Sequence, residues 1–109
     1  MGLERHEAML LVRTDLGRRL DALEARLERR GPIGAEGEAW TIAMLAGDYG
    51  LAAAQRLAEG LAAALGQGGR GAAIGAWLER LRDAIDDMTP GDRPGDDAWL
   101  AAVMVRLAG

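Results

Sequence analysis

Apolar residues recur every three or four positions in the first part of the chain, and this spacing limits the fold more than any other feature. Positions three and four apart share one face of an α-helix, whereas a half-buried strand alternates with a period of two. The spacing predicts a long amphipathic helix over residues 3–30, with arginine and glutamate opposite the apolar stripe. The stripe consists of Met9, Val12, Leu16, Leu20, Leu23 and Leu27.

The next helical pattern contains two glycines. A glycine inside a helix costs about 0.8–1 kcal/mol relative to alanine, yet the apolar positions keep their helical phase on both sides of Gly47 and Gly50. Because the phase is unbroken, we predict one long helix over residues 35–65 that tolerates both glycines. Its inward positions are Ile42, Leu45 or Ala46, Tyr49, Ala53, Leu57, Leu61 and Leu65.

Two shorter helices are predicted after turns rich in glycine or proline, over residues 72–88 and 97–108. The inward positions of the first are Ile74, Trp77, Leu78, Leu81, Ile85 and Met88. The apolar face of the second consists of Trp99, Leu100, Val103, Met104 and Leu107.

Four helices joined by short turns favour an antiparallel up-and-down four-helix bundle, formed as a single domain over residues 1–109. The composition agrees, because residues that favour strands are scarce: the chain has no phenylalanine and a single tyrosine. The stripe over residues 3–30 is also close to a heptad repeat, so a coiled-coil homodimer is an alternative.

The charge and composition exclude several classes of function. A net charge of −4 argues against a nucleic-acid partner, and the absence of cysteine excludes disulfides and thiolate metal sites. No apolar segment approaches the roughly 18 residues of a membrane span, so we expect a cytoplasmic protein with no membrane contact. Every basic residue is arginine, which together with many alanines and glycines is typical of a GC-rich bacterial coding sequence.

No group of residues predicts an enzyme, a cofactor or a metal site. The only histidine, His6, lacks the three or four convergent ligands that a metal needs. The carboxylates of Asp83 and Asp86 share a helix face, but Arg80 and Arg82 lie beside them, which favours a solvated, salt-bridged face. We therefore expect no catalytic, cofactor-binding or metal-binding residues.

Residues 43–85, AMLAGDYGLAAAQRLAEGLAAALGQGGRGAAIGAWLERLRDAI, resemble the central part of histidine-containing phosphotransfer (HPt) domains. In that family a long helix carries a signature similar to A-H-x-L-K-G-S-A, followed by L-A-x-x-x-x-x-L-E. Residues 45–47 lie on the L-K-G of this signature, and residues 57–59 lie on a later L-A-E. The resemblance extends over about residues 15–87.

The resemblance implies a protein that binds a response-regulator receiver or a histidine kinase without accepting phosphate. The phosphoacceptor position holds Ala43 and the lysine position holds Ala46, whereas Gly47 would leave a bare patch of helix for the partner. Trp40, beside the stripe, is either the edge of the core or a partner anchor. The implied partner-binding residues are Trp40, Ala43, Met44, Gly47, Asp48 and Gly50. The alternative is a structural or assembly protein that forms a homodimer, through the stripe over residues 3–30 or through the Gly47/Gly50 face.

Overall fold

The computed structural model describes residues 2–68 and 71–87. In this part of the chain the regular secondary structure is entirely helical: α1 (Gly2–Arg30), α2 (Glu36–Asp48), α3 (Ala52–Gly66) and α4 (Gly71–Asp86). The predicted all-α class is therefore confirmed, and the predicted helices over residues 3–30 and 72–88 correspond to α1 and α4. The predicted helix over residues 97–108 lies outside the described residues.

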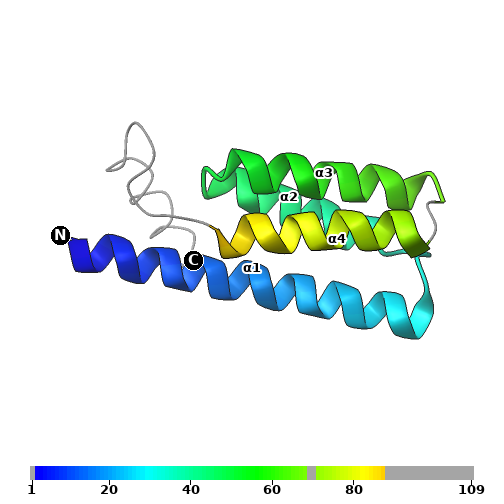
Figure 1. The fold of residues 1–109 in the computed structure, drawn as a ribbon, viewed down its shortest axis with the longest axis horizontal. Coiled ribbons are helices and arrows are strands. Elements are labelled where there is room, and N and C mark those ends of the chain that lie inside the picture. Colours follow the sequence, from blue (N-terminus) through cyan, green and yellow to red (C-terminus); the bar gives the residue numbers. More distant parts are fainter. Residues whose placement is uncertain (1, 69–70, 88–109) are drawn as a thin grey trace.

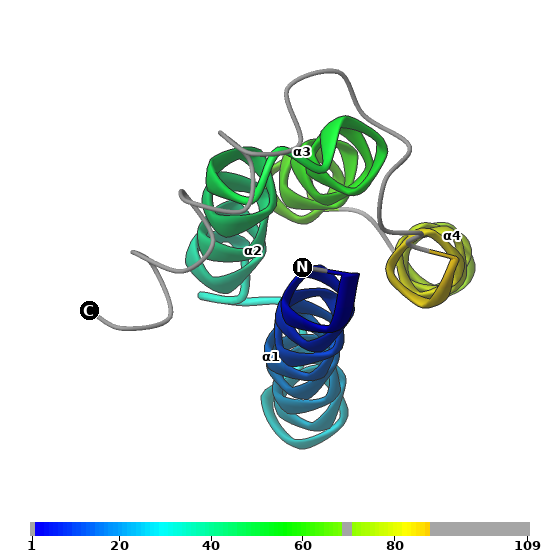
Figure 2. The same ribbon diagram turned by 90° about the vertical axis from the view of Figure 1, so that its left-hand side faces the viewer.

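The described helices form an antiparallel up-and-down four-helix bundle. Successive helices run in opposite directions along the long axis (Figure 1). Viewed end-on, they follow one another in chain order around the bundle (Figure 2), and α1 packs against both α2 and α4. None of the described helices is both long and apolar enough to cross a membrane.

The prediction of one helix over residues 35–65 is wrong, because the chain reverses direction between α2 and α3. Gly50 adopts a φ of 78°, a left-handed conformation that an L side chain rarely takes. The N–H of Leu51 donates to the carbonyl of Ala46 at 2.8 Å, and the N–H of Gly50 donates to Gly47 at 3.0 Å. These two bonds form a Schellman motif, which satisfies the last carbonyls of α2 and ends the helix.

All four described helices contribute to the core. The largest fully buried side chains are Tyr49, Leu16, Leu20, Leu23, Ile42, Leu61, Leu81, Ile85 and Val12. Full burial of one such aliphatic side chain contributes about 1.5–3 kcal/mol. The stripe predicted for α1 therefore faces the core as expected, except that Leu27, near the end of the helix, is only half-buried.

Two polar contacts join α1 to α2 and fix their register. The hydroxyl of Tyr49 donates to Asp15 at 3.1 Å, and Arg26 forms an ion pair with Glu38 of α2 at 2.7 Å. Burial of Tyr49 and the neighbouring Asp15 carboxylate raise the pKa of the phenol to about 12. Tyr49 therefore joins the end of α2 to the middle of α1 as a neutral hydrogen-bond donor.

Candidate functional site

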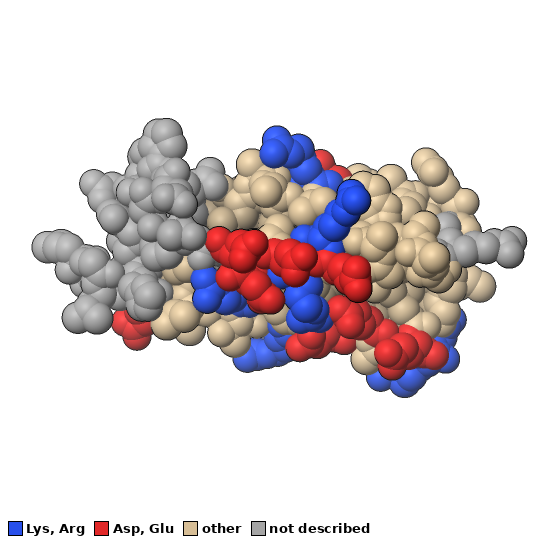
Figure 3. Space-filling model, in the orientation of Figure 1, with Lys and Arg blue, Asp and Glu red and all other residues tan. Residues whose placement is uncertain are grey.

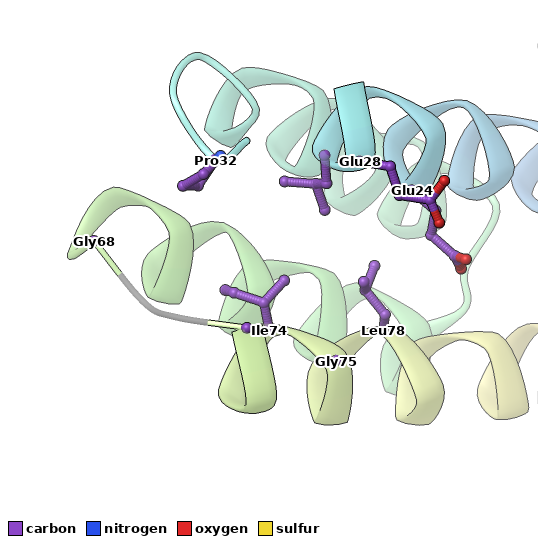
Figure 4. A pocket seen from close by; sticks show the side chains of 9 residues that line it. Glu24, Glu28, Pro32, Gly68, Ile74, Gly75 and Leu78 are labelled. Carbon is purple, nitrogen blue, oxygen red and sulfur yellow. The ribbon is translucent and has the colours of Figure 1, made fainter. Parts of the chain in front are cut away.

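A groove of about 560 Å³ lies between the C-terminal half of α1 and the N-terminal half of α4 (Figure 4). Its volume falls within the range of small-molecule pockets. We call this feature the α1–α4 groove. The groove is lined by Glu24, Leu27, Glu28, Pro32, Gly68, Gly71, Ile74, Gly75 and Leu78.

The walls of the α1–α4 groove are apolar. Ile74 and Leu78 are one turn apart on α4 and point toward α1 (Figure 4). Leu27 lines the groove from α1. Leu27 and Leu78 are only half-buried, so apolar surface remains available in the groove.

Glycine keeps the α4 side of the groove open. Gly71 and Gly75 are four residues apart, and a Cβ added at either position would meet no atom within 4 Å. Gly60 of α3 is different, because an added Cβ would overlap the indole of Trp77. Gly60 is therefore needed for close packing of α3 on α4, whereas Gly71 and Gly75 leave a space that the described part of the bundle does not fill.

The charged residues that line the groove are both glutamates. Glu24 accepts a hydrogen bond from Arg82 at 2.6 Å, and Asp21 accepts one from the same guanidinium at 2.7 Å. The hydrogen bond to Glu24 contributes most and the one to Asp21 next, and together they raise the pKa of Arg82 above its ordinary value. Glu28 is exposed, and among the described residues it has no ion pair or side-chain hydrogen bond. The rim of the groove therefore carries one uncompensated negative charge.

Carboxylates also gather on the face of the molecule that contains α1 and α4 (Figure 3). The exposed acids of these two helices include Asp21, Glu28, Glu79, Asp83 and Asp86, and their exposed arginines include Arg18, Arg29, Arg30 and Arg80. Arg82 reaches across to α1 rather than pairing with the aspartates of its own helix. Arginines lie among the carboxylates on this face (Figure 3), so its charge is mixed, and Glu28 is the groove-lining acid left for a cationic group of a partner.

Only three of the six residues predicted as a partner surface form an exposed row along α2. Trp40 and Met44 are 45% and 58% exposed, and Asp48, one turn further along α2, is also exposed. The indole N–H of Trp40 donates to Glu36 at 3.2 Å, so this tryptophan is held at the surface by its own helix.

The other predicted positions serve the fold. Ala43 is only 2% exposed and belongs to the core, so its prediction as a surface residue is wrong. An added Cβ on Gly47 would lie 2.9 Å from the amide nitrogen of Gln55 on α3, so this glycine faces a helix of the same chain. Gly50 forms the turn between α2 and α3. The bare patch predicted around Gly47 is therefore covered by the α2–α3 hairpin.

Sequence reasoning identified the groove residues Leu27, Ile74 and Leu78 only as inward positions. Their helical spacing indicates the direction in which they point, but it does not show whether another helix closes over them. Gly71 and Gly75 were the available signal, since four-residue spacing places two missing side chains on one face of α4.

Within residues 2–68 and 71–87, no three histidine, cysteine, aspartate or glutamate side chains are placed to hold a metal ion. His6 lies in α1, and its side chain is outside what the structure describes. Comparison of the chain with protein-family models, with curated proteins and with solved structures gives no match. The resemblance to HPt domains is thus neither supported nor contradicted by these comparisons.

Proposed function

We propose that this protein is a non-catalytic protein-binding module that receives a basic amphipathic helix of its partner in the α1–α4 groove. The observation that carries the proposal is the opening between two neighbouring helices of a packed bundle, with apolar walls and an open glycine side. The rim charge specifies the partner further, because Glu28 lacks a cation among the described residues.

The shape of the groove suits recognition of a helix. Partner helices commonly insert apolar side chains spaced three and four residues apart into an elongated apolar groove. Such side chains would contact Leu27, Ile74 and Leu78, while a lysine or arginine at the edge of the partner helix would pair with Glu28. Gly71 and Gly75 would allow the partner to approach the backbone of α4 closely.

The test uses two fluorescently labelled helical peptides of about 18 residues, roughly 27 Å long as helices. Both carry leucine at helical spacing, and they differ only in having lysine or glutamate at the polar positions. Fluorescence anisotropy should show binding of the lysine peptide and much weaker binding of the glutamate peptide. Equal binding of both peptides would contradict the charge requirement.

Gly75→Leu should block the groove and Gly17→Leu serves as its matched control. Both glycines are helical and half-buried, and an added Cβ on either meets no atom within 4 Å, but only Gly75 lines the groove. Gly75→Leu should weaken binding of the lysine peptide about tenfold or more, equivalent to about 1.4 kcal/mol. Unchanged affinity in Gly75→Leu, or an equal loss in both variants, would exclude the groove as the binding site.

A narrower alternative follows from the resemblance to HPt domains, and the exposed side chains of Trp40 and Met44 favour it. In this version α2 presents these two side chains to a receiver or to a histidine kinase, with no transfer of phosphate. Phosphorylated receiver should bind without forming an acid-labile phosphoprotein, and Trp40→Ala should weaken that binding. Transfer of label that disappears in His6→Ala would overturn the non-catalytic assignment.

Homodimer formation is the alternative from a different class, that of structural and assembly proteins. A second copy could use the groove or the exposed face of α2 as its contact. Sedimentation equilibrium across a range of concentrations distinguishes the cases, because the proposed module stays monomeric without its peptide. A dimer that Gly75→Leu dissociates would show that the groove serves self-association.

A further inference from the structure

A side-chain bridge crosses from α4 to α1 at one end of the α1–α4 groove. One terminal nitrogen of the Arg82 guanidinium donates to Glu24 at 2.6 Å and to Asp21 at 2.7 Å. Arg82 lies one helical turn beyond Leu78, and both Leu78 and Glu24 line this end of the groove. The groove therefore ends at the bridge, and the carboxylate of Glu24 already holds a cation that belongs to the chain itself.

The two glutamates that line the groove differ in what they offer a partner. Glu24 and Glu28 are four residues apart on α1 (Figure 4), so they share one face of the helix about 6 Å apart along its axis. Glu24 is partly buried and bonded to Arg82, whereas Glu28 is exposed and has no ion pair among the described residues. Of these two acids at helical spacing, only Glu28 is left for a cation from outside.

The bridge opposes a second cation from the partner. A lysine placed beside Glu24 would also lie beside the guanidinium of Arg82, and two positive charges at such short range repel each other. Displacement of Arg82 would in turn break both of its bonds to α1. A lysine placed beside Glu28, one turn further along α1, meets neither cost. The two positions therefore favour a partner cation very unequally.

We propose that Arg82 determines the specificity of the α1–α4 groove, because it occupies Glu24 and leaves a partner helix one position for a cation, beside Glu28. The inference rests on the proposed function and adds where on the partner helix the positive charge must lie. A second lysine or arginine one turn away would face the Arg82 bridge and contribute nothing. The affinity of a partner then depends on where its cation lies more than on how many cations it carries.

A single-lysine scan of the partner peptide tests the proposal on the unmodified protein. The peptides keep the leucines of the helical peptide described above and carry glutamine at every polar position except one, which is lysine. Fluorescence anisotropy should show one maximum of affinity along the scan, about threefold above the all-glutamine peptide, as expected for one exposed ion pair. Two equal maxima four residues apart would overturn the proposal, because Glu24 would then accept a partner cation despite Arg82.

Arg82→Met and Arg80→Met form a matched pair of variants. Each removes one cation from α4, but of the two arginines only Arg82 is bonded to α1. In Arg82→Met the scan should show a second maximum four residues from the first, and the added change Glu24→Gln should abolish it. Arg80→Met should keep a single maximum. A merely structural role of Arg82 would weaken all peptides alike, and a single maximum in Arg82→Met would overturn the proposal.

Failure of this inference and failure of the proposed function give different results. If the groove is not the binding site, Gly75→Leu leaves the affinity of every peptide in the scan unchanged. If the groove binds the helix but Arg82 does not restrict it, Gly75→Leu still weakens binding while the scan contradicts the expected maxima. Partly exposed ion pairs contribute little to stability, so Arg82→Met should fold, which circular dichroism checks. The scan on the unmodified protein decides the question if it does not.

Discussion

The two sides of α4 use glycine in opposite ways. On the side facing α3, Gly60 makes room for the indole of Trp77, and any larger residue would overlap the ring. On the side facing α1, Gly75 borders open space. The α3–α4 contact is closed because Gly60 leaves room for the indole of Trp77. The α1–α4 contact stays open because Gly71 and Gly75 have no side chains to fill it.

This contrast separates internal packing from a surface left for a partner. A glycine that allows two helices to pack closely stabilises the fold by more than its low helix propensity destabilises it. A helical glycine with open space around it lowers stability and gains no internal contact, and where it lines a groove, as Gly75 does, it leaves room for a side chain of a partner. The same substitution should consequently have opposite effects on the two sides of α4.

Gly60→Ala should produce the largest loss of stability in this comparison. Overpacking a core contact costs about 1–3 kcal/mol, and the gain in helix propensity returns about 0.5–1 kcal/mol. We expect a net loss of about 1–2 kcal/mol in the free energy of unfolding, measured by urea denaturation.

The double variant Gly60→Ala/Trp77→Leu provides the control. If the loss comes from overlap with the indole, adding alanine should cost much less when leucine replaces Trp77. A full loss in the Trp77→Leu background would show that Gly60 is required for another reason, and the closed side of the comparison would need a different explanation.

Gly50→Ala should cost about 1 kcal/mol, because residues other than glycine pay about 1–2 kcal/mol for a left-handed conformation. Thermal unfolding measures the effect, and Gly37→Ala is the control: Gly37 is a helical glycine with no atom within 4 Å of an added Cβ. A stabilised Gly50→Ala variant would mean that the helix continues through residues 49–51, contrary to the observed hairpin.

A substitution of Tyr49 tests the polar contact between α1 and the end of α2. The variant Tyr49→Phe loses the hydrogen bond to Asp15, which should reduce stability at neutral pH by about 0.5–1.5 kcal/mol. The burial of the aromatic ring is retained, so the variant isolates the polar contact. Urea denaturation at pH 7 measures this difference.

The pH dependence of the same contact has a defined sign. The pKa of Tyr49 is raised from 10.0 to about 12 in the folded protein, so the folded state holds its proton after the unfolded state has lost it. The stabilisation is complete below pH 10 and is lost as the pH rises toward 12. Because the chain has one tyrosine and no lysine or cysteine, Tyr49→Phe should remove most of the alkaline loss between pH 10 and 11.5. An equally steep loss of stability with pH in Tyr49→Phe would contradict the assignment of this loss to ionisation of Tyr49.

The helical periodicity of the sequence was sufficient to predict α1, α4 and the all-α class. It failed between α2 and α3, because the apolar residues on the two sides of the hairpin happen to keep the phase of one helix. The local signal was Gly50 followed by apolar Leu51, which suits a Schellman motif. Leu51 provides no side-chain cap, so the usual polar start signal of α3 was missing.

The α1–α4 groove depends on long-range geometry that the sequence pattern does not contain. Leu27 and Leu78 have the spacing of core residues, and whether they are covered depends on how closely α1 and α4 approach each other. Trp40 illustrates the same limit at the surface, since its position beside the stripe allowed either a core edge or an exposed anchor. Only the three-dimensional packing distinguishes these cases.

The smallest expected change in stability gives the most direct test of the α1–α4 groove as an open site. Gly75→Ala should raise the free energy of unfolding by about 0.5–1 kcal/mol, because helix propensity improves and the added Cβ meets no neighbour. Thermal unfolding should therefore show a higher Tm for Gly75→Ala and a lower Tm for Gly60→Ala, measured side by side. A clear fall in Tm for Gly75→Ala would mean that Gly75 is packed inside the bundle, and the α1–α4 groove could not be a site left open for a partner.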